Sequence, residues 1–211
     1  ILRIIAAGEH KLGHIAAKLG VPGQKITQYL DILRDLEIIE RRVPITEKNP
    51  EKSRRGLYFI KDYYIRFWFR FVFPWQSYLE MGNTGFVMKI VKKEFHSFTS
   101  LVFEDISRQL LIDYCPFPVN KIGSYWSKDI EIDIVGYNQE SGEYIFGECK
   151  WTKEKMDMRD LQKLLSKADQ VAWPHDKRTE HFILFSKNGF TPDLQAMADG
   201  QKAIILVDFS Q

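Results

Sequence analysis

The stretch IEIDIVGYNQESGEYIFGECKW, residues 130–151, predicts a β-hairpin. Apolar and polar residues alternate in its first half, which places Ile132 and Ile134 on one face of a strand and Asp133 on the other. Residues 144–150 have the composition of a second strand, and the intervening NQESG is typical of a turn. The rest of the chain is interpreted around this pair of strands.

The predicted hairpin brings acidic side chains together. Every second side chain of a strand points the same way, so Glu148 and Lys150 share a face and Cys149 points away. Asp133 then lies across from Glu148. Two carboxylates about 5 Å apart repel by about 3 kcal/mol at an effective dielectric constant of about 20, which a hard divalent cation relieves. Such an ion, with a lysine to orient water, performs phosphodiester hydrolysis, so we expect Mg²⁺ or Mn²⁺ as the cofactor.

These residues resemble the PD-(D/E)xK, or restriction-endonuclease-like, superfamily of nucleases. The core of that superfamily runs helix, three strands, helix, strand, and the resemblance covers about the C-terminal half of the chain. It implies that Asp133, Glu148 and Lys150 are catalytic and that the two acids bind the metal. The proline that many members carry before the aspartate is replaced by Ile132.

Two flanking helices supply further candidate residues. The resemblance implies that a glutamate on the helix before the first strand completes the metal site. Glu104 matches that position and Asp105 is the other candidate, whereas a simple helix pair between Glu104 and Arg108 is the alternative interpretation. The resemblance also implies an auxiliary role for a Gln or Lys on a predicted helix at 158–171, whose polar side carries Gln162, Lys163 and Lys167. We choose Gln162, with an exposed helix face as the alternative.

Composition and short motifs exclude several classes of protein. The net charge of the 211 residues is +2, but residues 1–80 hold 14 Lys or Arg against 9 Asp or Glu. Cys115 and Cys149 form no CxxC pair, which argues against a zinc site or a disulfide scaffold. The chain shows no transmembrane run and no signal peptide, so we expect a cytoplasmic protein without a membrane partner. It has no GxxxxGK[ST] motif and therefore no predicted ATP site.

Residues 1–61 resemble a winged helix-turn-helix. Two short helices, a VPGQ turn and a longer helix at 24–36 precede strands at 38–45 and 56–60, and the loop TEKNPEKSRR would form the wing. We expect DNA contacts from the third helix and the wing, through Gln24, Lys25, Gln28, Arg41, Arg42, Arg54 and Arg55. The alternative is a solvated charged loop on a domain that packs against protein, because Asp31 and Asp35 would face phosphate unfavourably.

An aromatic-rich segment, 62–97, follows as a predicted helical connector. Its rings could stack on single-stranded bases, but a buried packing joint between two domains is the favoured interpretation. Helices are predicted at 86–96 and 98–114, the second with an apolar stripe of Val102, Ile106 and Leu110. Residues 98–211 are then an α/β domain with a restriction-endonuclease-like αβββαβ core.

The combination of a winged helix, DYYIRFWFRFVFPW (62–75), FED, EIDIV and GECKW resembles the C-terminal region of predicted archaeal and bacterial P-loop ATPases. The resemblance implies an upstream ATPase module as a partner, and the start at Ile1 within a helical pattern leads us to expect a piece of a longer protein. The function expected first is a metal-dependent nuclease. A catalytically silent DNA-binding or regulatory domain of the ATPase is the alternative. A simple winged-helix regulator explains least, because the acidic hairpin would then have no purpose.

Overall fold

The computed structural model describes residues 1–171 and 178–210 and has a mixed α/β fold. The chain divides into two compact units, one made of residues 1–43 and 47–96, the other of residues 44–46 and 97–211. Each unit has its own hydrophobic core. Residues 62–96 of the predicted aromatic connector thus belong to the first unit, and its last residue, Ser97, belongs to the second.

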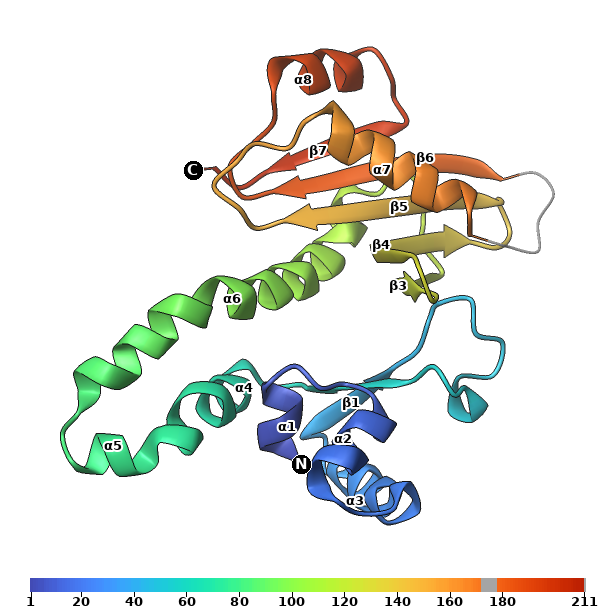
Figure 1. The fold of residues 1–211 in the computed structure, drawn as a ribbon. Coiled ribbons are helices and arrows are strands. Elements are labelled where there is room, and N and C mark those ends of the chain that lie inside the picture. Colours follow the sequence, from blue (N-terminus) through green and yellow to red (C-terminus); the bar gives the residue numbers. More distant parts are fainter. Residues whose placement is uncertain (172–177, 211) are drawn as a thin grey trace. The chain divides into compact units, whose positions relative to one another are not determined.

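The first unit packs three helices against a small antiparallel sheet (Figure 1). Its elements are α1 (Leu2–Ala6), α2 (Leu12–Leu19), α3 (Gly23–Asp35), β1 (Ile39–Arg42) and β2 (Leu57–Ile60). Helix α2 ends at Gly20, whose φ of 66° suits a residue without Cβ. The core is built by Ile5, Ile15, Leu30 and Ile60, each at most 2% exposed.

The aromatic segment was expected to form one helix. It forms four short helical pieces instead. These are α4 (Tyr63–Phe67), a π-helical turn (Trp68–Val72), a 3₁₀ turn (Phe73–Trp75) and α5 (Gln76–Glu80). Asp62 caps the first piece by accepting the Ile65 N–H at 2.8 Å. Pro74 has no N–H to donate, so a regular helix cannot run through it.

Helix α6 (Thr84–Tyr114) is a single helix of 31 residues where two helices were predicted. Its buried side within the second unit also differs from the predicted stripe, since Ile106 is 40% exposed while Phe103 and Leu111 are buried. Phe103 sets this rotation, because its ring packs 5.0 Å from Trp151 and 5.3 Å from Phe209, measured between ring centroids.

A five-stranded sheet forms the second unit. Its strands, in spatial order, are β3 (Lys121–Trp126), β4 (Glu131–Asn138), β5 (Glu143–Lys150), β6 (Thr179–Ser186) and β7 (Ile204–Asp208). The first three are antiparallel, so the predicted hairpin is confirmed, and β5, β6 and β7 are parallel. The two parallel connections run through α7 (Met158–Asp169) and α8 (Pro192–Asp199).

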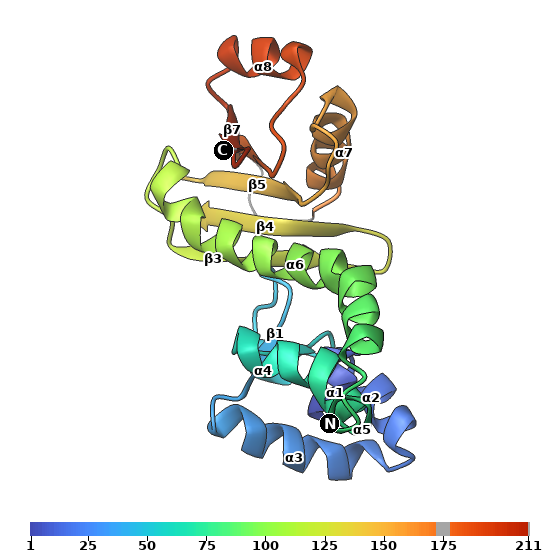
Figure 2. The ribbon, with the colours of Figure 1, turned by 90° about the vertical axis from the view of Figure 1, so that its left-hand side faces the viewer.

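The sheet is covered on both faces (Figure 2). Leu161 and Leu164 of α7 and Leu194 of α8 pack against one face. Phe103 and Leu111 of α6 pack against the other. Burial on both faces explains the continuous apolar run of the inner strand β6, whereas β7, at the edge of the sheet, is only partly buried.

A β-bulge interrupts the pairing of β3 with β4. Gly123 pairs with Val135 but Tyr125 pairs with Ile132, so β4 holds one residue more than β3 across this gap. As a result Ile132 lies in the core beside α7, whereas Ile134 lies in the core beside α6. The prediction that these two isoleucines share a face was therefore wrong.

Residues Pro44–Thr46 cover the edge strand β3. The Ile45 N–H donates to the Ser124 carbonyl at 2.9 Å, and the Ile45 carbonyl accepts from Lys121 Nζ at 3.1 Å. The Ile45 side chain is 4% exposed and lies over Gly123, where an added Cβ would come within 3.3 Å of it. An open strand edge is thereby protected from pairing with another chain.

Candidate functional site

Strand β5 and helix α7 are joined by two ion pairs. Glu148 Oε2 lies 2.7 Å from Lys167 Nζ, and Lys150 Nζ lies 2.8 Å from Asp160 Oδ2. Glu148 and Lys150 are two residues apart on the strand, so both side chains point toward α7, as the strand period predicts. All four side chains are partly exposed, so the pairs lie at the border of the core.

Asp160 is itself held in place by the start of α7. The Asp160 carboxylate accepts the Asp157 N–H at 3.0 Å, and the Asp157 carboxylate accepts the N–H groups of Arg159 and Asp160, which completes a capping box. The Asp160 carboxylate therefore links the helix cap to the Lys150 ammonium group. Sequence reasoning missed Asp160, although D-M-R-D before an apolar helix is a capping pattern.

Asp133 lies at the bulge of β4 and takes the place of a ladder partner. Its Oδ2 accepts the Cys149 N–H at 2.9 Å, at the point where the regular pairing of β4 and β5 has ended. Burial raises the pKa of Asp133 well above its ordinary value, and the negative charges of Glu148 and Glu104 raise it further. The three carboxyl groups named by the sequence are thus near enough to interact strongly.

Arg108 of α6 holds the backbone beside this carboxylate. Its guanidinium group donates to Asp105 Oδ1 at 2.9 Å, to Ser124 Oγ at 3.0 Å and to the Asp133 carbonyl at 3.3 Å. Asp105, the alternative to Glu104 as a site residue, is only 7% exposed and is occupied by Arg108. The structure therefore favours Glu104 over Asp105 as the acid of α6 that acts on Asp133.

The oxygen donors of Glu104, Asp133 and Glu148 suit Mg²⁺ or Mn²⁺ chemically. As the side chains lie, however, no group of three or more His, Cys, Asp or Glu residues within the described ranges is positioned to hold a metal ion. Glu148 instead binds the Lys167 ammonium group.

Cys149 points to the opposite face from Glu148, as predicted, and packs in the core beside α6, where it is partly buried. Burial raises the pKa of its thiol well above the ordinary value, and the neighbouring Asp133 carboxylate raises it further. The thiol stays protonated at neutral pH and is a poor nucleophile.

The candidate auxiliary residues on α7 differ in their contacts. Gln162 is exposed, whereas Lys167 contacts Glu148. Lys167 follows Asp160 by seven residues, two helical turns, so both lie on the side of α7 that faces β5. That spacing was the available signal for choosing Lys167.

The predicted nucleic-acid residues of the first unit fall into two groups. Gln24, Lys25 and Gln28 on α3 are exposed, and so is Arg54, which makes no hydrogen bond or ion pair with the described residues.

The other three predicted arginines are engaged within the unit. Arg41 donates to the carbonyls of Pro50 and Ser53, and Arg42 pairs with Glu40 and lies 4.4 Å from the centroid of the Phe59 ring. Arg55 pairs with Glu47. Arg42 and Arg55 thus each have a carboxylate partner, whereas Arg41 donates to two neutral carbonyl groups of the loop.

The rings of the aromatic segment are less buried than predicted. Phe71 is fully buried, but Tyr63, Tyr64 and Phe73 are 36%, 69% and 41% exposed. The expectation that these rings form a buried joint was wrong for those three.

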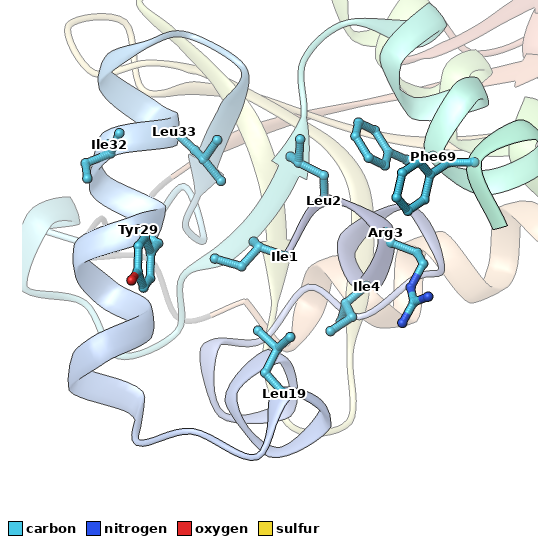
Figure 3. Close-up of a pocket in the computed structure, with 10 residues that line it drawn as sticks. Ile1, Leu2, Arg3, Ile4, Leu19, Tyr29, Ile32, Leu33 and Phe69 are labelled. Carbon is cyan, nitrogen blue, oxygen red and sulfur yellow. The ribbon is translucent and has the colours of Figure 1, made fainter.

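Next to this segment lies an apolar cavity of about 480 Å³, lined by α1, α2, α3 and the aromatic residues (Figure 3). On its α3 side, Tyr29 and Ile32 are about half exposed. The outward surface of α3 is thus partly apolar rather than wholly polar.

Among the described residues, the structure has no helix with the length and apolar character needed to span a bilayer.

Comparison with known proteins gives two similarities. An uncharacterized protein of Methanocaldococcus jannaschii is 38% identical over 169 residues, which cover 78% of this chain and 37% of that protein. The chain thus spans little more than a third of the length of this curated relative. No solved structure matches. Residues 68–163, from the π-helical turn into α7, are similar to a family described as archaeal and bacterial proteins of unknown function.

Proposed function

We propose that the second unit is a metal-dependent phosphodiesterase that cuts DNA and has a restriction-endonuclease-like core. The observation that carries this proposal is the crowding of Asp133 with Glu148 and Glu104, which raises the pKa of Asp133 well above its usual range. Lys150 projects from the same strand face as Glu148. Crowded, partly buried acids beside a lysine are typical of functional sites.

Each residue has a distinct role in the proposed reaction. Glu104, Asp133 and Glu148 would hold a Mg²⁺ or Mn²⁺ ion, which would supply Lewis-acid polarisation of the phosphoryl group. Lys150 orients the attacking water and is itself positioned by Asp160. Arg108 fixes the Asp133 backbone through its carbonyl, so that the carboxylate keeps its direction.

The first unit would bind DNA in the manner of a winged helix. We assign the contacts to the exposed Gln24, Lys25 and Gln28 of α3 and to Arg54. Such polar and basic groups position a duplex mainly through its phosphates. Arg41, Arg42 and Arg55, the other predicted DNA contacts, have partners within the unit, so we rank their contribution to DNA binding below that of Arg54.

The alternative is a catalytically silent DNA-binding or regulatory domain. It is favoured by one specific observation, namely that α7 engages both Glu148 and Lys150 in ion pairs and that the described side chains present no three-residue metal group. A working partnership with an upstream P-loop ATPase module, and a cytoplasmic location, rest on the resemblance and the composition and stay predictions.

The two functions separate in a cleavage assay with single-stranded, duplex and branched DNA in Mg²⁺ or Mn²⁺. The wild type should cut at least one of these forms, and Lys150→Ala should lose the activity while it still binds metal. Lys163→Ala is the matched control, because Lys163 is an exposed lysine on α7. Absence of cleavage by the wild type on all three forms would support the silent domain.

A further inference from the structure

Lys167 occupies the place where the proposed site needs positive charge. Its Nζ lies 2.7 Å from Glu148 Oε2, and both side chains are a little more than a quarter exposed. Lys167 also acts on Asp133, whose pKa it lowers against the larger upward effects of burial, Glu148 and Glu104. The one ammonium group therefore contacts Glu148 and acts electrostatically on Asp133.

We propose that Lys167 is a built-in counter-ion that competes with the divalent metal for Glu148, so that metal binding requires the lysine to leave. This inference rests on the proposed metal site. The geometry supports it, because an ammonium group 2.7 Å from Glu148 Oε2 takes the direction along which that oxygen would accept a cation, and its positive charge repels a divalent ion at the other carboxylate oxygen. The same contact stabilises the folded protein when no metal is present.

The arrangement of α7 makes the exchange possible without unfolding. Leu164 and Ala168, which flank Lys167 on the helix, are fully buried and fix the backbone. The lysine side chain is long and partly exposed, so its ammonium group can move into water while the helix stays in place. Asp160 keeps its separate pairing with Lys150 throughout.

The test is Mn²⁺ binding, measured by calorimetry on the whole chain, together with the melting temperature with and without Mn²⁺. Lys167→Met should bind Mn²⁺ about fivefold more tightly, equivalent to about 1 kcal/mol. Without metal it should melt below the wild type, because two carboxylates lose their counter-ion. Lys167→Arg, which keeps the charge, and Lys163→Met, which removes an exposed lysine of the same helix, should both remain close to the wild type.

The possible outcomes separate this inference from the proposed function. Tighter Mn²⁺ binding by Lys167→Met alone supports the counter-ion, even if no variant cuts DNA, in which case the nuclease proposal fails by itself. If the wild type cuts DNA but Lys167→Met binds Mn²⁺ equally or more weakly, Lys167 holds Glu148 for the metal and the inference is overturned. If no variant binds Mn²⁺ at millimolar concentration, both fail.

Discussion

Asp133 combines two roles that its neighbourhood sets against each other. As a hydrogen-bond acceptor it satisfies the Cys149 N–H, which the bulge leaves without a ladder partner. As a charge it is repelled by Glu148 and Glu104. The hydrogen bond stabilises the fold and favours the ionised carboxyl, because it lowers the pKa of Asp133. The repulsion destabilises the fold unless a cation or a proton is bound.

Two substitutions at this position separate the roles. Asp133→Asn keeps an oxygen acceptor and removes the charge, so without metal at pH 7 it should unfold at or above the wild-type temperature. Asp133→Ala also loses the acceptor, and leaving the Cys149 N–H unpaired costs about 1–3 kcal/mol. Thermal unfolding of the three proteins in a chelator provides the measurement. If Asp133→Asn and Asp133→Ala destabilise the protein equally, the charge of Asp133 does not destabilise the fold. Neither variant should gain stability from Mn²⁺.

His10 gives the first unit a pH dependence of its own. The ring nitrogen Nδ1 lies 2.8 Å from the Tyr58 carbonyl, and the ring stacks on Phe59 at 4.2 Å between centroids. Burial lowers the pKa of His10; the hydrogen bond to Tyr58 opposes this, and the charges of Arg66 and Arg42 lower the pKa further. The folded protein therefore holds a neutral imidazole.

The sign of the effect follows from that lowered pKa. Below about pH 6.5 the His10 side chain is protonated in the unfolded chain but not in the folded chain, whose His10 has the lower pKa. The free energy of unfolding should therefore fall as the pH drops from about 6.5 to the lowered pKa of the folded state. His10→Gln should lose part of this dependence in urea unfolding at pH 7.5 and 5.5. His14→Gln, which changes an exposed histidine, should retain it. An unchanged dependence in His10→Gln contradicts the assignment.

At the scale of elements, α7 was predictable and the bulge of β4 was not. Leu161, Leu164 and Ala168 recur at helical spacing and are all fully buried, so the pattern predicted both the helix and its inner face. In β4, Ile132 and Ile134 are both apolar, so a change of face between them leaves no trace in the alternation. The position of Asp133 depends on that bulge, which is why its hydrogen bond to Cys149 was not predicted.

The start of α7 allows capping to be separated from positioning. Asp157→Ala removes the cap together with the Arg159 pair and should lower the stability with cleavage retained. The pKa of Asp157 is lowered to about 2, chiefly by its hydrogen bond with Arg159, so this cap is ionised at neutral pH. Asp160→Ala should lower the stability too, because it also loses a capping hydrogen bond, but it should in addition release Lys150.

The decisive readout is cleavage at equal folded fraction, with urea unfolding as the measure of stability. Asp160→Ala should lower kcat in the manner of Lys150→Ala and shift the pH profile of the reaction, while Asp160→Asn, which retains an oxygen acceptor, should recover part of the rate. If Asp157→Ala and Asp160→Ala reduce cleavage equally, Asp160 acts through the helix cap only.

At the scale of the molecule, the order of the elements followed from hydrophobic periodicity, but the membership of the two units did not. Residues 38–45 read as one strand, whereas β1 ends at Arg42 and residues 44–46 belong to the second unit. The triplet Pro44–Thr46 has no pattern of its own. What places it is the surface of β3, where Gly123 leaves room for Ile45, and such a long-range fit is not encoded in local sequence.

Because Ile45 belongs to the second unit, substituting it should affect a different part of the protein than substituting its sequence neighbour Ile39. Ile45 is 4% exposed in the core of the second unit, and Ile39, six residues earlier, is 1% exposed in the core of the first. Either Ile→Ala change removes a buried side chain and should cost about 2–5 kcal/mol. Hydrogen exchange followed by mass spectrometry should show that Ile45→Ala weakens protection in β3 and β4 and spares α1 to α3. Ile39→Ala should do the reverse, and loss of protection in the same segments by both variants would mean that Ile45 supports the first unit.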